Sequence, residues 1–283
     1  MFTGVPKWFT VLPVQREGSQ PRIAHVVSRG NPQYWGETHE PLNVELQRVV
    51  RQAWVDRPPI TDLQLQFIPH YAGKHCLESI RLSRLANGGG AHAVAVGLLR
   101  DAVEALSLVA LGICHDGAKL RILSEWNEEK RSAGEVRKYL EEVVWPTLGI
   151  SGLWGEQWSA FWASIARAVQ PYAHVSPLRL RWHQHVEIID GRWHVWINHP
   201  AGDFEMYRAA RIGALQLLLF WAFAEIVCAF AADTEAHLSR LRTLADVARH
   251  WLSKNEVFFH GENWEGQLMP FVYPTDARYW GQE

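Results

Sequence analysis

The stretch AHAVAVGLLRDAVEALSLVALGI, residues 91–113, decides the fold class. It is apolar on most faces of a helix, and its charged residues are Arg100, Asp101 and Glu104. A helix that is apolar nearly all round is typical of the centre of a helical bundle. Arg100 and Glu104 stand four residues apart, so we expect an ion pair that fixes the helix register and not a catalytic pair.

Hydrophobic periodicity divides the chain into three parts. Residues 1–66 predict an irregular N-terminal segment with short strands, and residues 67–253 predict a helical bundle. Residues 254–283 predict an aromatic tail that packs back on the bundle. The expected fold class is therefore mainly α, a helical bundle that carries an inserted β-hairpin at about residues 182–198.

The hairpin is predicted from WHQHVEIIDGRWHVWIN, in which polar and apolar residues alternate around Asp190-Gly191. This dipeptide is typical of a two-residue hairpin turn. The turn places three potential metal ligands on one face: His185, Glu187 and His194. Imidazole and carboxylate groups suit a metal ion. The alternative is a polar face in contact with solvent. We expect this alternative, and we expect no metal and no other cofactor.

Residues 212–232, IGALQLLLFWAFAEIVCAFAA, are long and apolar enough to span a bilayer. The segment also contains Gln216 and Glu225, and a carboxylate near the middle of a bilayer is costly. We therefore expect a helix buried in the bundle and no membrane association.

The composition excludes several classes of protein. Lys and Arg number 28 against 30 Asp and Glu, which gives a net charge of −2, so any nucleic-acid site must be local. The three cysteines, Cys76, Cys114 and Cys228, show no CxxC spacing, which argues against a disulfide framework or a cysteine zinc site. Residues 1–20 lack a basic segment followed by an apolar run, so we expect no signal peptide and a cytoplasmic location.

The stretch RAVQPYAHVS, residues 167–176, carries the candidate site. On a helix over residues 156–170, Arg167 points away from the apolar stripe. If the helix continued, His174 would lie on the same face as Arg167. Pro171 predicts a stop or a kink before that point. Histidine can move a 2′-hydroxyl proton, and arginine can hold a phosphate with two hydrogen bonds. Two further residues make the neighbourhood basic: Arg179 and Arg181. The alternative is a solvated helix end with no catalytic role.

The spacing from Arg167 to His174 resembles the Arg-x4–6-His signature of the HEPN superfamily. Two further features are similar to HEPN-like bacterial abortive-infection proteins: the stretch VGLLRDAVEALSLVALGI, and PYAHVS followed by a long apolar helix. The resemblance extends over residues 70–250. The resemblance implies a homodimeric, metal-independent endoribonuclease, an effector or toxin of an anti-phage system. It also implies roles for four residues: Arg167 and His174 in catalysis, Arg179 and Arg181 in binding RNA phosphates.

The same resemblance leaves a second function open. The superfamily contains inactive members that bind nucleotides or partners, which implies a non-catalytic helical binding or scaffold subunit of a defence complex. Two residues depart from the active pattern, because Ala168 stands where a polar residue is frequent and Pro171 interrupts the spacing. A shared fold does not decide between these functions.

Overall fold

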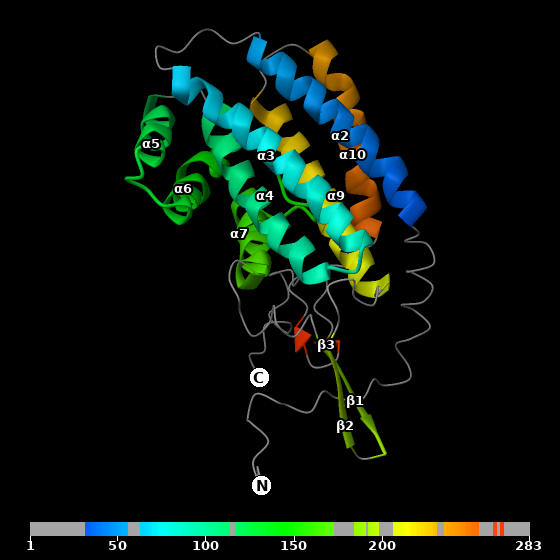
Figure 1. Cartoon of the computed structure of the whole chain (residues 1–283). Helices are drawn as coiled ribbons and strands as arrows, with labels where there is room; N and C mark the ends of the chain where they lie inside the picture. Colours follow the sequence, from blue (N-terminus) through cyan, green and yellow to red (C-terminus); the bar gives the residue numbers. More distant parts are fainter. Residues whose placement is uncertain are drawn as a thin grey trace.

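The computed structural model describes residues 32–55, 63–113, 117–172, 184–190, 192–197, 206–230, 235–254, 263–264 and 267–268. The α-helices are α2 (Pro32–Val55), α3 (Leu63–Gly88), α4 (His92–Ile113), α5 (Gly117–Asn127), α6 (Ala133–Tyr139), α7 (Trp158–Val169), α9 (Met206–Phe230) and α10 (Glu235–Lys254). Shorter elements are the π-helix η1 (Leu140–Val144), the 3-10 helices η2 (Trp145–Thr147) and η3 (Gln170–Tyr172), and the strands β1 (Gln184–Ile189), β2 (Arg192–Ile197), β3 (Asn263–Trp264) and β4 (Gln267–Leu268). The predicted mainly α class is confirmed (Figure 1).

Helix α9 lies inside the bundle and packs against α2, α3, α4 and α10 (Figure 1). Every side chain over residues 211–224 is buried. In the described part of the chain, one helix, Ala209–Ala229, is long and apolar enough to cross a membrane, and 83% of its most apolar window is buried inside the protein. Its apolar surface is therefore covered by the neighbouring helices.

Two polar groups of α9 have partners on the helices around it. Gln216 Nε2 donates a hydrogen bond to Ser83 Oγ of α3 at 2.8 Å, and both side chains are buried. His39 Nε2 of α2 lies 3.2 Å from the backbone oxygen of Gly213. Buried polar groups cost free energy unless they are hydrogen-bonded. These bonds therefore explain how an apolar core accepts Gln216, the residue that argued for burial in protein.

Gly112 allows α3 and α4 to approach closely. A Cβ atom at Gly112 would lie 1.9 Å from Cγ of Pro69, which stands inside α3. The two helices lie side by side (Figure 1), joined by a short turn in which Gly90 has a φ of 78°. The left-handed backbone at Gly90 suits glycine, because it has no Cβ.

Helix α2 corrects the prediction of an irregular segment, which was wrong over residues 32–55. Leu42, Leu46 and Val49 recur at helical spacing and are buried, and α2 packs against α9 and α10. Burial of this stripe outweighs the low helix propensity of Pro41, which stands inside the helix. The short strands expected before residue 32 lie outside the described residues.

Strands β1 and β2 pair antiparallel, with Glu187 opposite His194 and His185 opposite Trp196. Asp190 at the turn has a φ of 52°, the left-handed conformation that type I′ turns use. Apart from Arg192, which is exposed, the side chains of both strands lie outside the described part of the structure. Of the C-terminal tail, the structure describes strands β3 and β4, which pair antiparallel, and the predicted packing of the tail lies outside it.

Candidate functional site

Arg167 lies in the last turn of α7, away from the face that packs into the core. Trp158, Phe161 and Ile165 of the same helix are buried, whereas Arg167 is exposed. Its Nε donates a hydrogen bond to the backbone oxygen of Ala163 at 3.3 Å. The placement of Arg167 opposite the apolar stripe is therefore as helical spacing predicts.

Helix α7 ends at Val169, and the 3-10 turn that follows contains Pro171, in agreement with the predicted stop. Tyr172 at the end of this turn is fully buried, and the turn packs against α4. The remaining predicted site residues lie outside the described structure: His174, Arg179, Arg181 and the side chains of His185, Glu187 and His194. Arg167 is thus the predicted site residue whose surroundings the structure describes.

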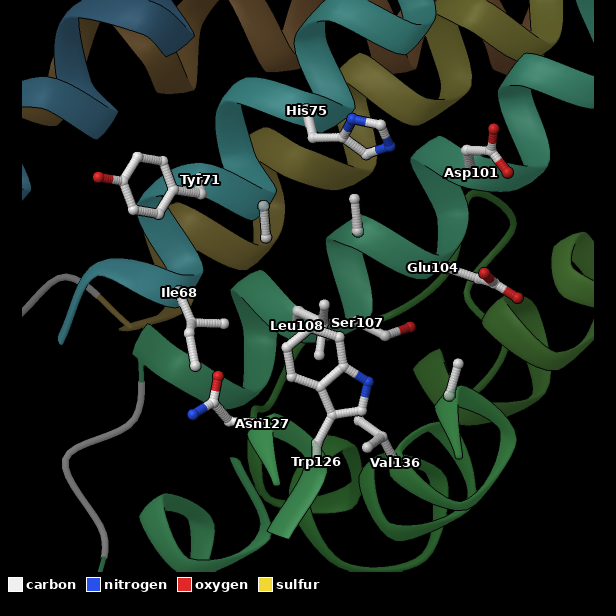
Figure 2. A pocket seen from close by; sticks show the side chains of 13 residues that line it. Ile68, Tyr71, His75, Asp101, Glu104, Ser107, Leu108, Trp126, Asn127 and Val136 are labelled. Carbon is white, nitrogen blue, oxygen red and sulfur yellow. The ribbon is translucent and has the colours of Figure 1, made fainter. Parts of the chain in front are cut away.

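A groove opens between α3, α4, α5 and α6, with a cavity volume of about 500 Å³. We term it the acidic groove. Figure 2 shows side chains from all four helices around it, and those of Asp101 and Glu104 come from α4. Its polar and aromatic lining includes Tyr71, His75, Asp101, Glu104, Trp126 and Asn127.

Two carboxylates on α4 make one wall of this groove negative. Arg100 Nη2 donates a hydrogen bond to Glu104 Oε1 at 2.6 Å, which confirms the predicted pair, and Arg100 Nη1 lies 3.6 Å from Asp101 Oδ1. One guanidinium therefore stands against two carboxylates, so this wall keeps a net negative charge. Asp101 and Glu104 are only part-exposed, which strengthens their interaction with any cation that enters.

Aromatic rings lie on the α3 side of the groove, across from the carboxylates in Figure 2. Tyr71 is 63% exposed and Phe67 is 42% exposed, and their ring centroids lie 6.1 Å apart on α3. The indole of Trp126, half-buried, lines the groove from α5 (Figure 2). Aromatic faces and carboxylates both attract cations, so a groove lined by the two kinds of group suits a cationic ligand.

Helix α6 forms another wall of the acidic groove, because the chain reverses between α5 and α6. Glu129 adopts a φ of 58° in the turn, and Ser132 then caps α6. The Ser132 hydroxyl accepts a hydrogen bond from the Glu135 N–H, and the Glu135 carboxylate accepts one from the Ser132 N–H, a capping box that lowers the pKa of Glu135. The helix that starts here brings the buried Val136 to the groove.

Comparison with protein-family models, with curated proteins and with solved structures finds no match for this chain. Among the described side chains, no three His, Cys, Asp or Glu residues gather as metal ligands. Burial raises the pKa of Cys228 to about 11, so this thiol is protonated at neutral pH and is a poor nucleophile.

Sequence reasoning missed the acidic groove, although two signals pointed to it. Asp101 and Glu104 interrupt a helix that is otherwise apolar, and Glu104 was interpreted only as the partner of Arg100 in an ion pair that fixes register. Trp126 stands in the charged stretch SEWNEEKRS, where a large aromatic side chain is unexpected on a solvated face. Both signals come from residues of the wrong polarity for their surroundings.

Proposed function

We propose that this chain is a helical binding protein whose acidic groove takes a guanidinium or ammonium group carried on an apolar body. Like the non-catalytic binding or scaffold subunit of a defence complex that the resemblance left open, such a protein binds without catalysis. The observation that carries it is that the carboxylates of Asp101 and Glu104 line the same groove as the rings of Trp126 and Tyr71.

The chemistry of the groove supports a cationic ligand over an anionic or neutral one. A carboxylate accepts charge-assisted hydrogen bonds from a guanidinium, and an aromatic face attracts the same cation. The apolar side chains of Ile68 and Leu108 line the groove and give the body of the ligand a surface to contact. An anion would meet the net negative wall of α4 and would be repelled.

The test is calorimetric titration of the full chain with agmatine, and with its uncharged isostere as the ligand control. Binding of agmatine should weaken roughly tenfold or more in the Asp101→Asn, Glu104→Gln double variant, since each charge-assisted hydrogen bond contributes about 1.5–3 kcal/mol. Glu142→Gln is the control, because it removes one negative charge from a side chain that is 63% exposed and lies outside the acidic groove. This variant should bind agmatine as the wild type does.

Two results would contradict this function. One is the absence of agmatine binding at millimolar concentration, and the other is equal binding of the charged and uncharged ligands. Glu104→Gln keeps a hydrogen-bond acceptor for Arg100, so a loss of binding without a loss of melting temperature separates a binding role from a structural one.

A HEPN-like, metal-independent endoribonuclease is the second candidate, favoured by one observation. Arg167 is exposed and lies off the core face of α7, so its guanidinium is not required for packing. In this candidate Arg167 holds the RNA phosphate and His174 moves the proton, with Arg179 and Arg181 as further phosphate contacts. The protein would act as a cytoplasmic homodimer, an effector or toxin of a bacterial anti-phage system, in a HEPN-like bundle that carries the hairpin.

Incubation of the chain with total RNA, with and without EDTA, tests this candidate. Cleavage should persist in EDTA and fall about 10²–10⁴-fold in His174→Ala, the typical contribution of general acid–base catalysis. Arg167→Lys should also lose activity, because lysine cannot hold a phosphate bidentately. Arg121→Lys, at a side chain that is 72% exposed on α5, is the matched control. Intact RNA with the wild-type chain, or full activity in His174→Ala, would reject the ribonuclease.

A further inference from the structure

A second groove lies on the side of α3 that faces α2, with a cavity volume of about 300 Å³. We term it the basic groove. Its charged lining comes from Arg51 on α2 and from Lys74, Glu78 and Arg81 on α3. Positive charges outnumber negative ones here by three to one, in a chain whose net charge is −2.

The ion pairs of the groove leave two of these cations for a ligand. Arg81 donates to both carboxylate oxygens of Glu78, at 2.8 Å and 2.5 Å, so these two charges satisfy each other. Arg51 and Lys74 form no ion pair with any residue in the described part of the chain, and both are exposed. A ligand that carries two negative charges would therefore balance the groove.

His70 supplies a polar group at the edge of the same cavity. It is half-buried, and burial lowers its pKa, which the nearby charges of Lys74 and Arg51 lower further. The imidazole is therefore neutral at neutral pH, and it can donate or accept one hydrogen bond at each ring nitrogen without adding charge. The amides of Asn43 and Gln47, joined by a 3.1 Å hydrogen bond, complete the polar lining from α2.

We propose that the basic groove binds a phosphate monoester. The guanidinium of Arg51 can hold two phosphate oxygens at once, and the ammonium of Lys74 acts as a point charge on the same group. Val50 and Leu77 are buried at the floor of the groove and give the organic part of the ester an apolar surface. The proposal does not depend on the acidic groove or on the ribonuclease candidate, because neither uses these residues.

A phosphate could also reach this groove as part of an RNA backbone, and charge separates the two sources. A phosphate monoester carries nearly two negative charges at neutral pH, whereas a backbone phosphodiester carries one. Calorimetric titration of the full chain in low-salt buffer with AMP, with the dinucleoside monophosphate ApA and with adenosine compares them directly. We expect AMP to bind roughly tenfold more tightly than ApA, and adenosine not to bind.

Variants then assign the binding to this groove. Arg51→Gln and Lys74→Gln should each weaken AMP binding roughly tenfold, because each removes a charge-assisted hydrogen bond. Lys138→Gln removes the same charge from a side chain that is 71% exposed on α6 and should leave AMP binding unchanged. Melting temperatures should stay at the wild-type value in all three variants, since all three side chains are exposed.

Three results would overturn the proposal. The first is the absence of AMP binding at millimolar concentration. The second is equal weakening by Lys138→Gln and Arg51→Gln, which would mean that AMP responds to overall charge and not to the groove. The third is ApA binding as tight as that of AMP, which would assign the groove to a nucleic-acid backbone in place of a monoester.

Discussion

Lys74 and His75 are consecutive residues of α3, and they line two different grooves. Lys74 faces the basic groove beside Arg51, whereas His75 faces the acidic groove opposite Asp101. One helix thus separates a positive cavity from a negative one, because adjacent residues of a helix point about 100° apart. A chain with almost no net charge can in this way carry two sites for ligands of opposite charge.

Gly112→Ala should destabilise the protein by about 1–3 kcal/mol, the usual cost of overpacking a core. The new Cβ would lie 1.9 Å from Cγ of Pro69, so α3 and α4 would have to separate. Urea denaturation measures the free energy of unfolding. Gly134→Ala is the control, since its nearest neighbour would be Ser132 Oγ at 3.9 Å, and it should be neutral or slightly stabilising. Equal effects at both glycines would show that the close approach at Pro69 is not tight.

Glu225→Gln should raise the melting temperature more at about pH 8 than at about pH 5. Burial raises the pKa of Glu225, so the folded protein holds this proton more tightly than the unfolded chain does. Its contribution to stability is therefore fully present below the unfolded pKa and is lost as pH rises through the folded pKa. Glutamine stays neutral at every pH and avoids the loss. A gain of the same size at both pH values would rule out this origin.

Ser83→Ala should cost about 1–3 kcal/mol of unfolding free energy, because it leaves the buried amide of Gln216 without its acceptor. The double variant Ser83→Ala, Gln216→Leu removes both partners and should lose less than the sum of the two single variants. A thermodynamic cycle from chemical denaturation gives the coupling energy. Additive effects would mean that the 2.8 Å bond contributes nothing to stability.

Arg167→Ala should change the free energy of unfolding by less than about 0.5 kcal/mol, the usual range for a surface position. Trp162→Ala, on the buried side of the same helix, should cost about 3–5 kcal/mol. The contrast tests whether Arg167 is free of a packing role. A loss above 1 kcal/mol in Arg167→Ala, on the order of a lost buried contact, would make the arginine structural and remove the support for a functional role.

The sequence predicted those elements whose pattern is local. Four predicted features depend on residues that are close in sequence: the apolar stretch of α4, the buried apolar helix α9, the end of α7 before Pro171 and the pair of Arg100 with Glu104. Helix α2 was missed because its stability comes from packing on α9 and α10, far along the chain. Tertiary burial there outweighs local propensity.

Both grooves were beyond sequence reasoning for the same physical reason. The acidic groove brings Tyr71, Asp101 and Trp126 together from three helices, and periodicity does not specify which helices become neighbours. The basic groove depends on the pairing of α2 with α3, and α2 was predicted to be irregular. The pairing of β1 with β2, by contrast, connects strands that are close in the sequence.

The position of α9 in the chain has a consequence for biosynthesis. His39 and Gly213 meet in the bundle although 174 residues separate them. At a translation rate of about 5–20 residues per second, roughly 10–35 s pass between the emergence of these two residues from the ribosome. Throughout that interval the apolar face of α2 lacks the helix that covers it, and the same holds for α3 and α4 from the time that each emerges. Newly made chains are therefore expected to need chaperones during synthesis, and a ribosome that stalls before residue 206 would release an aggregation-prone product.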